Sequence, residues 1–267
     1  MHLNRTGAIT LRQFYLLRGS IARFLQLFAW VAVDIILWGF LTRYLNSVAA
    51  PGFNFVSMLL GAVLFWDFFS RVLHGVTTAF LEDIWSRNFL NFFASPLSIG
   101  EYQLGLVISS VLTSLIGLVF MLILATFVFG LSFAAYGIAV LPFLMVLFLF
   151  GIALGILGTA VVLRFGPASE WFVWPLPALV SPFVGVFYPL STLPAWMRVV
   201  ARALPPSYVF ENMRAVAAGR AVSGTDLVIA VILGCVYVGV SLFIFTRVFK
   251  YGVRSGLIAR YSAESVN

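Results

Sequence analysis

Long runs of apolar residues, separated by short polar stretches, form most of the chain. Each run is close to the roughly 20 residues that an α-helix needs to cross a bilayer. The pattern predicts six membrane-spanning helices, at residues 24–42, 55–73, 104–130, 138–163, 171–188 and 227–249. The second can continue helically toward Phe80, and Pro175, Pro177 and Pro182 break the fifth.

The polar segments before and after these helices complete the layout. Residues 1–23 carry four arginines and no acid among apolar residues, which predicts a basic helix lying on the membrane surface. No small-residue cleavage site follows it, so we expect this helix to be retained. The simplest organisation is one domain over 1–267: a surface helix at 1–23, a six-span core at 24–250 and a tail at 251–267.

The stretch 78–102 interrupts the apolar pattern between the second and third spans. On helical spacing Asp83, Arg87 and Asn91 share one side, with aromatic residues mostly on the other. The spacing predicts a short helix along the membrane surface, with its polar side in water and its aromatic side in the headgroups. An ordinary interfacial connector is the alternative.

A second unusual region follows the fifth span, at 189–220. It is too charged to cross a membrane and too apolar for a free loop. We therefore expect two short helices that dip into the outer leaflet, one started by Pro194 and stopped by Pro205–Pro206, the other capped by Ser207 and ended by Gly219. Such a hairpin is either an outer gate or an inert cap. Its candidate gate residues are Pro194, Arg198, Arg202, Pro205, Glu211 and Arg214.

Composition makes the membrane assignment firm. Hydrophobic residues are 62% of the chain and charged residues 9%, more apolar surface than a soluble core could bury. The net charge of +7 comes almost wholly from arginine and is a topology signal before it is a sign of nucleic-acid binding, which we do not expect. With the N-terminus inside, ten basic residues face the cytoplasm and five face outward, which favours cytoplasmic termini.

Charged residues inside the predicted spans are candidates for function. Asp34 lies in the first span, while Asp67, Arg71 and His74 share one face of the second at helical spacing. Charges within a membrane are costly unless they are paired or face water. Arg71 can neutralise Asp67, Asp34 or both, and the group is either the polar lining of a substrate path or a structural ion pair.

Other chemistry is not indicated. A single cysteine, Cys235, and two histidines leave no basis for a metal site, and no phosphate-cradling ATPase loop or nucleophile motif occurs in the sequence. We expect no catalytic residues, no metal and no cofactor in this chain. Gly151, Gly155 and Thr159 follow a small-xxx-small spacing, which we interpret as packing within one chain.

The order of these parts resembles the permease subunits of type-2 ABC exporters over nearly the whole chain. Two segments carry the resemblance best. Residues 82–98 look like the cytoplasmic coupling helix of that family, ending in Ser-Pro-Leu, and residues 187–214 look like the segment that follows its fifth span.

The resemblance implies an all-α integral membrane fold and an ATP-driven exporter that moves an amphipathic molecule, such as a lipid, glycan or drug, along a dimer interface. It implies partners: membrane lipids, a separate ABC ATPase that binds ATP and Mg, and a second permease copy. It also implies a multi-pass protein of the bacterial cytoplasmic (inner) membrane. The residues that would contact the ATPase are Glu82, Asp83, Trp85, Arg87 and Asn88.

Two other functions remain open from the residues alone. One is an ion-coupled secondary carrier that uses Asp34, Asp67 and His74 as proton sites. The missing internal repeat and the surface helix count against it. The other is a membrane assembly factor without transport activity.

Overall fold

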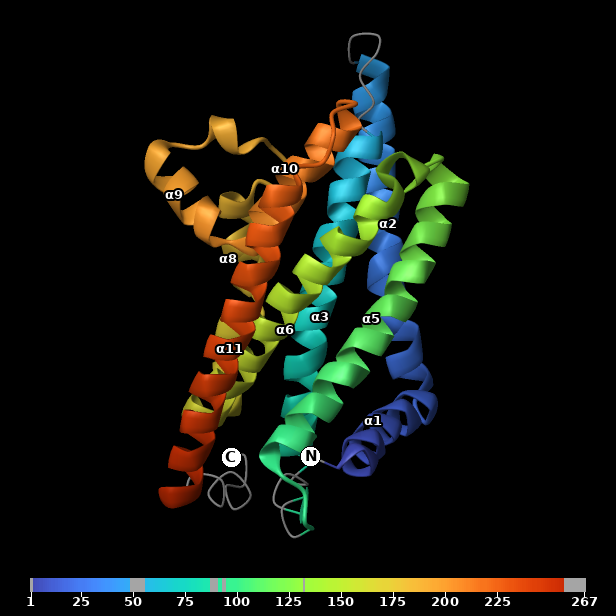
Figure 1. The fold of residues 1–267 in the computed structure, drawn as a ribbon. Helices are drawn as coiled ribbons and strands as arrows, with labels where there is room; N and C mark the ends of the chain where they lie inside the picture. Colours follow the sequence, from blue (N-terminus) through green and yellow to red (C-terminus); the bar gives the residue numbers. More distant parts are fainter. Residues whose placement is uncertain (1, 49–55, 87–90, 93–94, 132, 257–267) are drawn as a thin grey trace.

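The computed structural model describes residues 2–48, 56–86, 91–92, 95–131 and 133–256, and most of this part of the chain is helical, with no strand in it. Five long helices form a bundle (Figure 1). They are α2 (Ile21–Val48), α3 (Gly61–Trp85), α5 (Ile99–Phe129), α6 (Val140–Phe165) and α11 (Gly224–Arg254). Each is long and apolar enough to cross a membrane, which confirms the predicted all-helical membrane fold. A short π-helix, η1 (Val56–Leu60), leads into α3, and a 3₁₀-helix, η2 (Phe133–Ala139), leads into α6.

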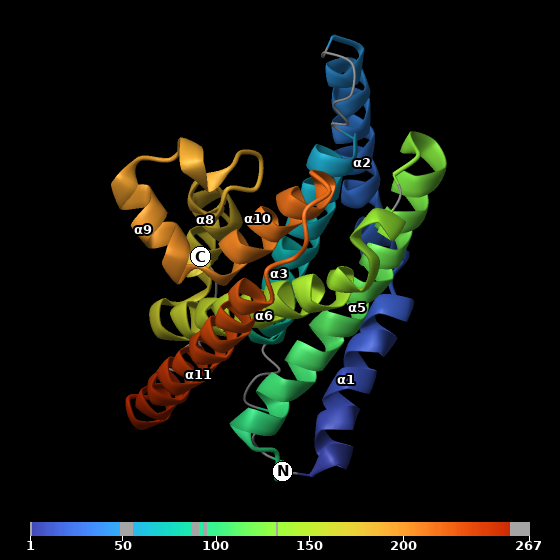
Figure 2. The same ribbon diagram turned by 45° about the horizontal axis from the view of Figure 1, so that its top comes forward.

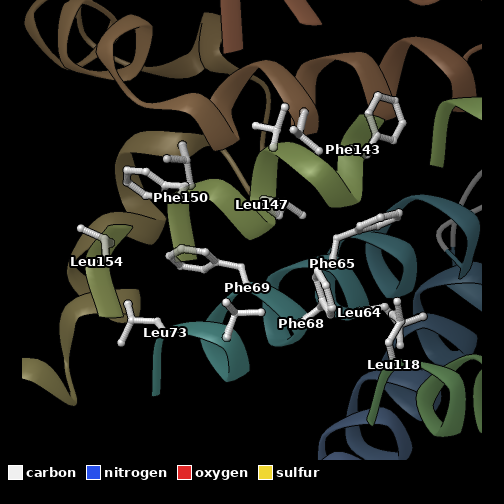
Figure 3. Packing of buried hydrophobic residues seen from close by; sticks show 14 of the residues in the cluster. Leu64, Phe65, Phe68, Phe69, Leu73, Leu118, Phe143, Leu147, Phe150 and Leu154 are labelled. Carbon is white, nitrogen blue, oxygen red and sulfur yellow. The ribbon is translucent and has the colours of Figure 1, made fainter. Parts of the chain in front are cut away.

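The core of the bundle is the contact between α3 and α6. Helix α6 packs most extensively against α11 on one side and α3 on the other. Figure 3 shows the aromatic and aliphatic side chains that meet between α3 and α6. Phe69 stacks on Phe150 with ring centroids 5.5 Å apart, and Phe65 meets the edge of Phe143 at 6.2 Å. Aromatic pairs in these geometries add to the stability that burial alone provides.

Small residues on α6 allow this close approach. A Cβ on Gly155 would lie 2.9 Å from the Cβ of Val76 and 3.0 Å from the carbonyl oxygen of Leu73, so only glycine fits there. Gly151 meets Val72 of the same helix α3 in the same way. The small-xxx-small motif is therefore packing within one chain, as the sequence indicated.

The ends of the long helices follow local sequence signals. Helix α5 begins earlier than predicted because Ser98 and Glu101 form a capping box: the Ser98 hydroxyl accepts the Glu101 N–H, and the Glu101 carboxylate accepts the Ser98 N–H at 3.0 Å. It ends at Gly130, whose φ of 70° is left-handed. Helix α3 runs past Phe80 to Trp85, which confirms and extends the predicted continuation of the second span.

The N-terminal helix α1 (Leu3–Arg18) confirms the helix expected there. It lies beside the first part of α5, as both views show (Figures 1 and 2). The last turns of α11 lie at the same end of the bundle as α1 (Figure 1). Helices α8 (Leu176–Val184), α9 (Ala195–Ala203) and α10 (Pro205–Ala217) lie toward the opposite end (Figure 1).

The predicted fifth span, 171–188, is not one continuous helix. After the turn η3 (Pro167–Ser169) the chain forms α7 (Glu170–Val173), breaks at Pro175 and forms α8 (Leu176–Val184). Helix α8 ends at Gly185, which has a φ of 65°. The two pieces have 4 and 9 residues, so at about 1.5 Å per residue they cover about 20 Å, less than the ~30 Å hydrocarbon core. Only Pro175 lies at the break, where the missing N–H interrupts the helical hydrogen bonds; Pro177 lies in the first turn of α8 and Pro182 inside α8, so the predicted breaks at these two positions are wrong.

The predicted hairpin between the last two spans is present. A turn, η4 (Leu190–Thr192), precedes α9 (Ala195–Ala203) and α10 (Pro205–Ala217). Pro194 caps α9 and Gly219 follows α10 with a φ of 72°, as predicted. Ser207 is not the cap of the second helix: α10 already begins at Pro205, and the Ser207 hydroxyl donates to the carbonyl of Ala201 at 2.6 Å. Proline suits a first helical position because no partner is needed there for the missing N–H.

Large apolar side chains remain exposed on the outer helices. On α2 they include Val33, Ile36, Leu37 and Phe40, and on α11 they include Ile232, Val236, Val240 and Phe243. In water such a surface would aggregate, but a bilayer or a second membrane subunit covers it at no cost.

Candidate functional site

The polar stretch after the second span begins inside α3 rather than in a separate surface helix. Thr78 to Trp85 continue α3 without a break, and the Ser86 N–H closes the last turn on the Glu82 carbonyl at 2.9 Å. Trp85 is 55% exposed at this tip. Arg87 and Asn88, two of the expected ATPase contacts, lie outside the described residues. A push on this tip would therefore act directly on a membrane-spanning helix.

Asp83 is fully buried, which corrects the expectation that it faces water. Its carboxylate accepts a hydrogen bond from Arg12 Nη2 on α1 at 2.6 Å and one from the Tyr102 hydroxyl on α5 at 2.7 Å. A buried carboxylate is tolerated only when it is paired and hydrogen-bonded in this way. The sequence could not indicate this burial because both partners are distant in the chain. We call Arg12, Asp83 and Tyr102 the three-helix clamp.

Further ion pairs tie α1 and the start of α2 to the same region. Arg23 Nη1 lies 3.1 Å from Glu82 Oε2. Arg5 lies 3.8 Å from Glu101 and also donates to the Pro96 carbonyl. Arginines of the N-terminal segment thus pair with acids on α3 and α5. These pairs fix α1 to the end of the bundle that carries the tip of α3, which we call the base of the bundle.

An aromatic contact extends the clamp. The Arg12 guanidinium lies 4.8 Å from the centre of the Phe92 ring, and Phe92 lies 5.6 Å from Tyr102. Cation–π contacts of this kind stabilise modestly when partly desolvated. Phe92 belongs to the aromatic side of the polar stretch, so this aromatic residue packs on protein.

A cavity of about 430 Å³, with charged and hydroxyl-bearing residues in its lining, opens in the helix bundle. We call it the upper cavity. Asp67, Arg71 and His74 all line it, so the predicted shared face of the second span is confirmed. Arg71 Nε donates to Asp67 Oδ2 at 2.9 Å, and 16% and 21% of the two side chains, respectively, remain exposed. The remaining lining residues are Arg23, Trp30, Ser70, Gly75, Thr78, Thr113, Ser114 and Trp174.

Asp34 and His74 take different places around this cavity. Asp34 on α2 is half-buried and does not line the cavity, although it is close enough to Asp67 and Arg71 to interact with them electrostatically. His74 Nε2 lies 3.3 Å from the Trp174 carbonyl oxygen, and the two rings are 4.6 Å apart. Since Trp174 directly precedes the break at Pro175, His74 connects α3 to the broken fifth segment.

A second, smaller cavity of about 180 Å³, also with charged and hydroxyl-bearing residues in its lining, lies between the upper cavity and the base of the bundle. We call it the lower cavity. It shares Arg23, Gly75, Thr78 and Thr113 with the upper cavity. It also reaches Glu82, beside the three-helix clamp. One polar side of α3, from its tip to the Asp67–Arg71 pair, therefore lines both cavities.

The hairpin residues fall into two groups. Glu211 and Arg214 form an ion pair at 2.8 Å and hold the chain around them: Glu211 accepts the Leu190 N–H at 2.8 Å, and Arg214 donates to the Gly185 carbonyl at 2.6 Å. Pro194, Arg198 and Arg202 are exposed on or beside α9, while Pro205, the sixth candidate, is buried at the start of α10 and belongs to neither group. The first group joins α10 to the end of α8, while the second is open to other molecules.

Several site residues were not singled out from the sequence. Ser70 and Thr78 lie three residues after Asp67 and four after His74, so the spacing that grouped the charges could have included them. Trp174 and Tyr102 gave no such signal, because they come from other segments of the chain, the turn after α7 and helix α5, and only the tertiary packing brings them to α3.

Comparison with known proteins agrees with this arrangement. The sequence model of the ABC-2 type transporter family matches residues 6–217, which is most of the chain. The chain therefore belongs to the ABC-2 type transporter family, and it is a multi-pass transport permease component. Family membership implies partnership with an ABC ATPase subunit. A search of curated proteins gave no significant match.

Proposed function

We propose that this chain is the transmembrane permease of an ATP-driven exporter that moves an amphipathic molecule such as a lipid, glycan or drug. A separate ATPase subunit binds ATP and Mg and supplies the energy, while this chain performs no covalent chemistry. Two permease copies pair in the bacterial inner membrane with both termini in the cytoplasm. Substrate passes along the interface between them and leaves past the α9–α10 hairpin. Glu82, Asp83, Trp85, Arg87 and Asn88 belong to the region that receives the ATPase.

The observation that carries the proposal is the three-helix clamp at the tip of α3. It joins α1, α3 and α5 through a buried carboxylate, so a force applied at this end moves three helices together. Interdigitated helices transmit such a push as a rigid body because their packing has few voids. The same helix α3 lines both cavities. It therefore connects its own tip, the receiving end for the ATPase, to the candidate substrate path.

The exposed apolar face of α2 supports pairing with a second copy. This helix is mostly exposed along its length, yet it stands next to the polar upper cavity. A second subunit packed there would enclose that cavity and keep lipid from its charges.

The test begins with co-expression of the chain with its ATPase. We expect co-purification of the two proteins and substrate movement in proteoliposomes only when ATP is hydrolysed. Arg87→Glu should leave the permease inserted while uncoupling ATP hydrolysis from transport. Transport by the chain alone, driven by a proton gradient and indifferent to ATP, would overturn the proposal.

A further inference from the structure

The chemistry of the upper cavity indicates what kind of group it accepts. Its volume of about 430 Å³ lies within the range of small-molecule sites, roughly 300–1,000 Å³. Its walls combine charged, hydroxyl-bearing and indole side chains rather than aliphatic ones. Such a lining can hold a ligand by directional hydrogen bonds as well as by hydrophobic contact.

Both arginines of the lining are paired with acids of the same chain: Asp67 lies in the lining, and Glu82 lies just outside it. Arg71 pairs with Asp67 at 2.9 Å, and Arg23 pairs with Glu82 at 3.1 Å. A cationic ligand drawn to Asp67 would meet Arg71 beside it, and an anion drawn to Arg71 would meet Asp67. An ion of either sign would thus meet a like charge beside the opposite one, which weakens its attraction to the site. Ion pairs of this type still offer donors and acceptors to an uncharged polar group.

Hydroxyl groups supply more hydrogen-bonding capacity. Ser70 Oγ donates to the Trp66 carbonyl at 2.9 Å, and Thr113 Oγ1 donates to the Ser109 carbonyl at 3.0 Å. Each hydroxyl proton is thus used, but each oxygen keeps lone pairs that can accept from a ligand. Together with the partly exposed Asp67, the cavity therefore favours ligands that donate several O–H groups.

Two indole rings provide flat apolar surface at the same site. Trp30 on α2 is 64% exposed and Trp174 is 49% exposed, and both line the cavity. The His74 ring lies against Trp174 at a tilt of 32°, and His74 Nε2 lies 3.3 Å from the Trp174 carbonyl oxygen, which holds that ring in place. A fixed, exposed indole face suits a ring with a mainly C–H face, because the contact excludes water without requiring charge.

From these observations we propose that the upper cavity binds a neutral, polyhydroxylated ring, such as the sugar head of an amphipathic molecule. The hydroxyls bond to Asp67, Arg71 and the Ser/Thr side chains, and a ring face lies on Trp30 or Trp174. That this ligand is the exported substrate rests on the proposed function, but its binding does not.

The experiment compares three water-soluble probes that share a phenyl group and differ in charge: phenyl β-glucoside, phenyl phosphate and phenyltrimethylammonium. The permease is reconstituted in nanodiscs without its ATPase, and affinities are measured by ligand-observed NMR against empty nanodiscs. We expect the glucoside to bind at least about tenfold more tightly than either ion, the ratio that one hydrogen bond to a charged group supplies. Equal or tighter binding of a charged probe would overturn the proposal.

Substitutions inside and outside the upper cavity test where the glucoside binds. Asp67→Asn and the milder Ser70→Ala should each weaken glucoside binding, whereas Trp171→Ala should not, because Trp171 is exposed on α7 and does not line the cavity. If Ser70→Ala and Asp67→Asn both retain wild-type affinity, the assignment is wrong. If the glucoside does not bind as expected while ATP-dependent transport is intact, only the proposed ligand class is rejected. Glucoside binding by a chain that needs no ATPase would reject the transport mechanism alone.

Discussion

The carboxylate of Asp83 lies 2.6 Å from the guanidinium of Arg12, a residue 71 positions earlier in the chain. Asp83 is fully buried, and Tyr102 donates to its second oxygen at 2.7 Å. This pairing makes the N-terminal helix a structural part of the bundle base. It also places a charge that looks accessible in the sequence at the centre of a packed junction.

Removal of one partner from this clamp should be strongly destabilising. We expect Asp83→Ala to lower the free energy of unfolding by about 3 kcal/mol, because Arg12 is left with an uncompensated charge. Glu82→Gln is the matched control, since its pair with Arg23 is more exposed and should contribute less than about 1 kcal/mol. Unfolding in mixed detergent micelles measures both, and similar losses for the two variants would contradict the clamp.

The Asp67–Arg71 pair in the upper cavity should behave as a coupled unit. Each single variant, Asp67→Asn or Arg71→Gln, leaves one charge unmatched within the membrane. We expect the double variant to be less impaired than the sum of the singles, with a coupling of roughly 0.5–3 kcal/mol. A double-mutant cycle on unfolding free energy measures this, and simple additivity would mean that the two residues do not pair.

Close packing of α6 on α3 depends on glycine at 155. We expect Gly155→Ala to destabilise by about 1–3 kcal/mol, because the new Cβ would overlap Val76 and the Leu73 carbonyl. Gly239→Ala on α11 has open space and should be neutral or stabilising by up to about 1 kcal/mol. Thermal unfolding of the two variants side by side makes the comparison, and an unchanged Gly155→Ala protein would exclude tight packing at this position.

The exposed Trp85 at the tip of α3 should matter for coupling and not for folding. Trp85→Ala is expected to reduce ATPase binding and substrate-stimulated ATP hydrolysis while changing stability by less than about 0.5 kcal/mol. Trp196→Ala serves as the control, since this exposed tryptophan lies on α9, away from the receiving end. Co-purification yield and ATPase rate are the measurements. Equal losses in both variants would argue against a specific role of this tip.

Local patterns in the sequence predicted much of the architecture. The continuation of α3 past residue 73, the hairpin begun by Pro194 and the shared face of Asp67, Arg71 and His74 all depend on helical spacing and on near neighbours. The same reasoning was wrong for Ser207, where a proline at the first helical position replaced the expected cap. It predicted that prolines interrupt 171–188 but still counted this segment as a full span, whereas α7 and α8 are both short.

The sequence by itself determined that this chain is a helical membrane protein, where its long helices run and which charges share a face. Hydrophobic length and helical periodicity are properties of contiguous residues, so no knowledge of the fold is required to use them. The tertiary structure alone decided that Asp83 is buried, that Arg12 and Tyr102 hold it, and that Trp174 meets His74 at the cavity. Those contacts join residues far apart in the chain, and their energies exist only once the helices have packed.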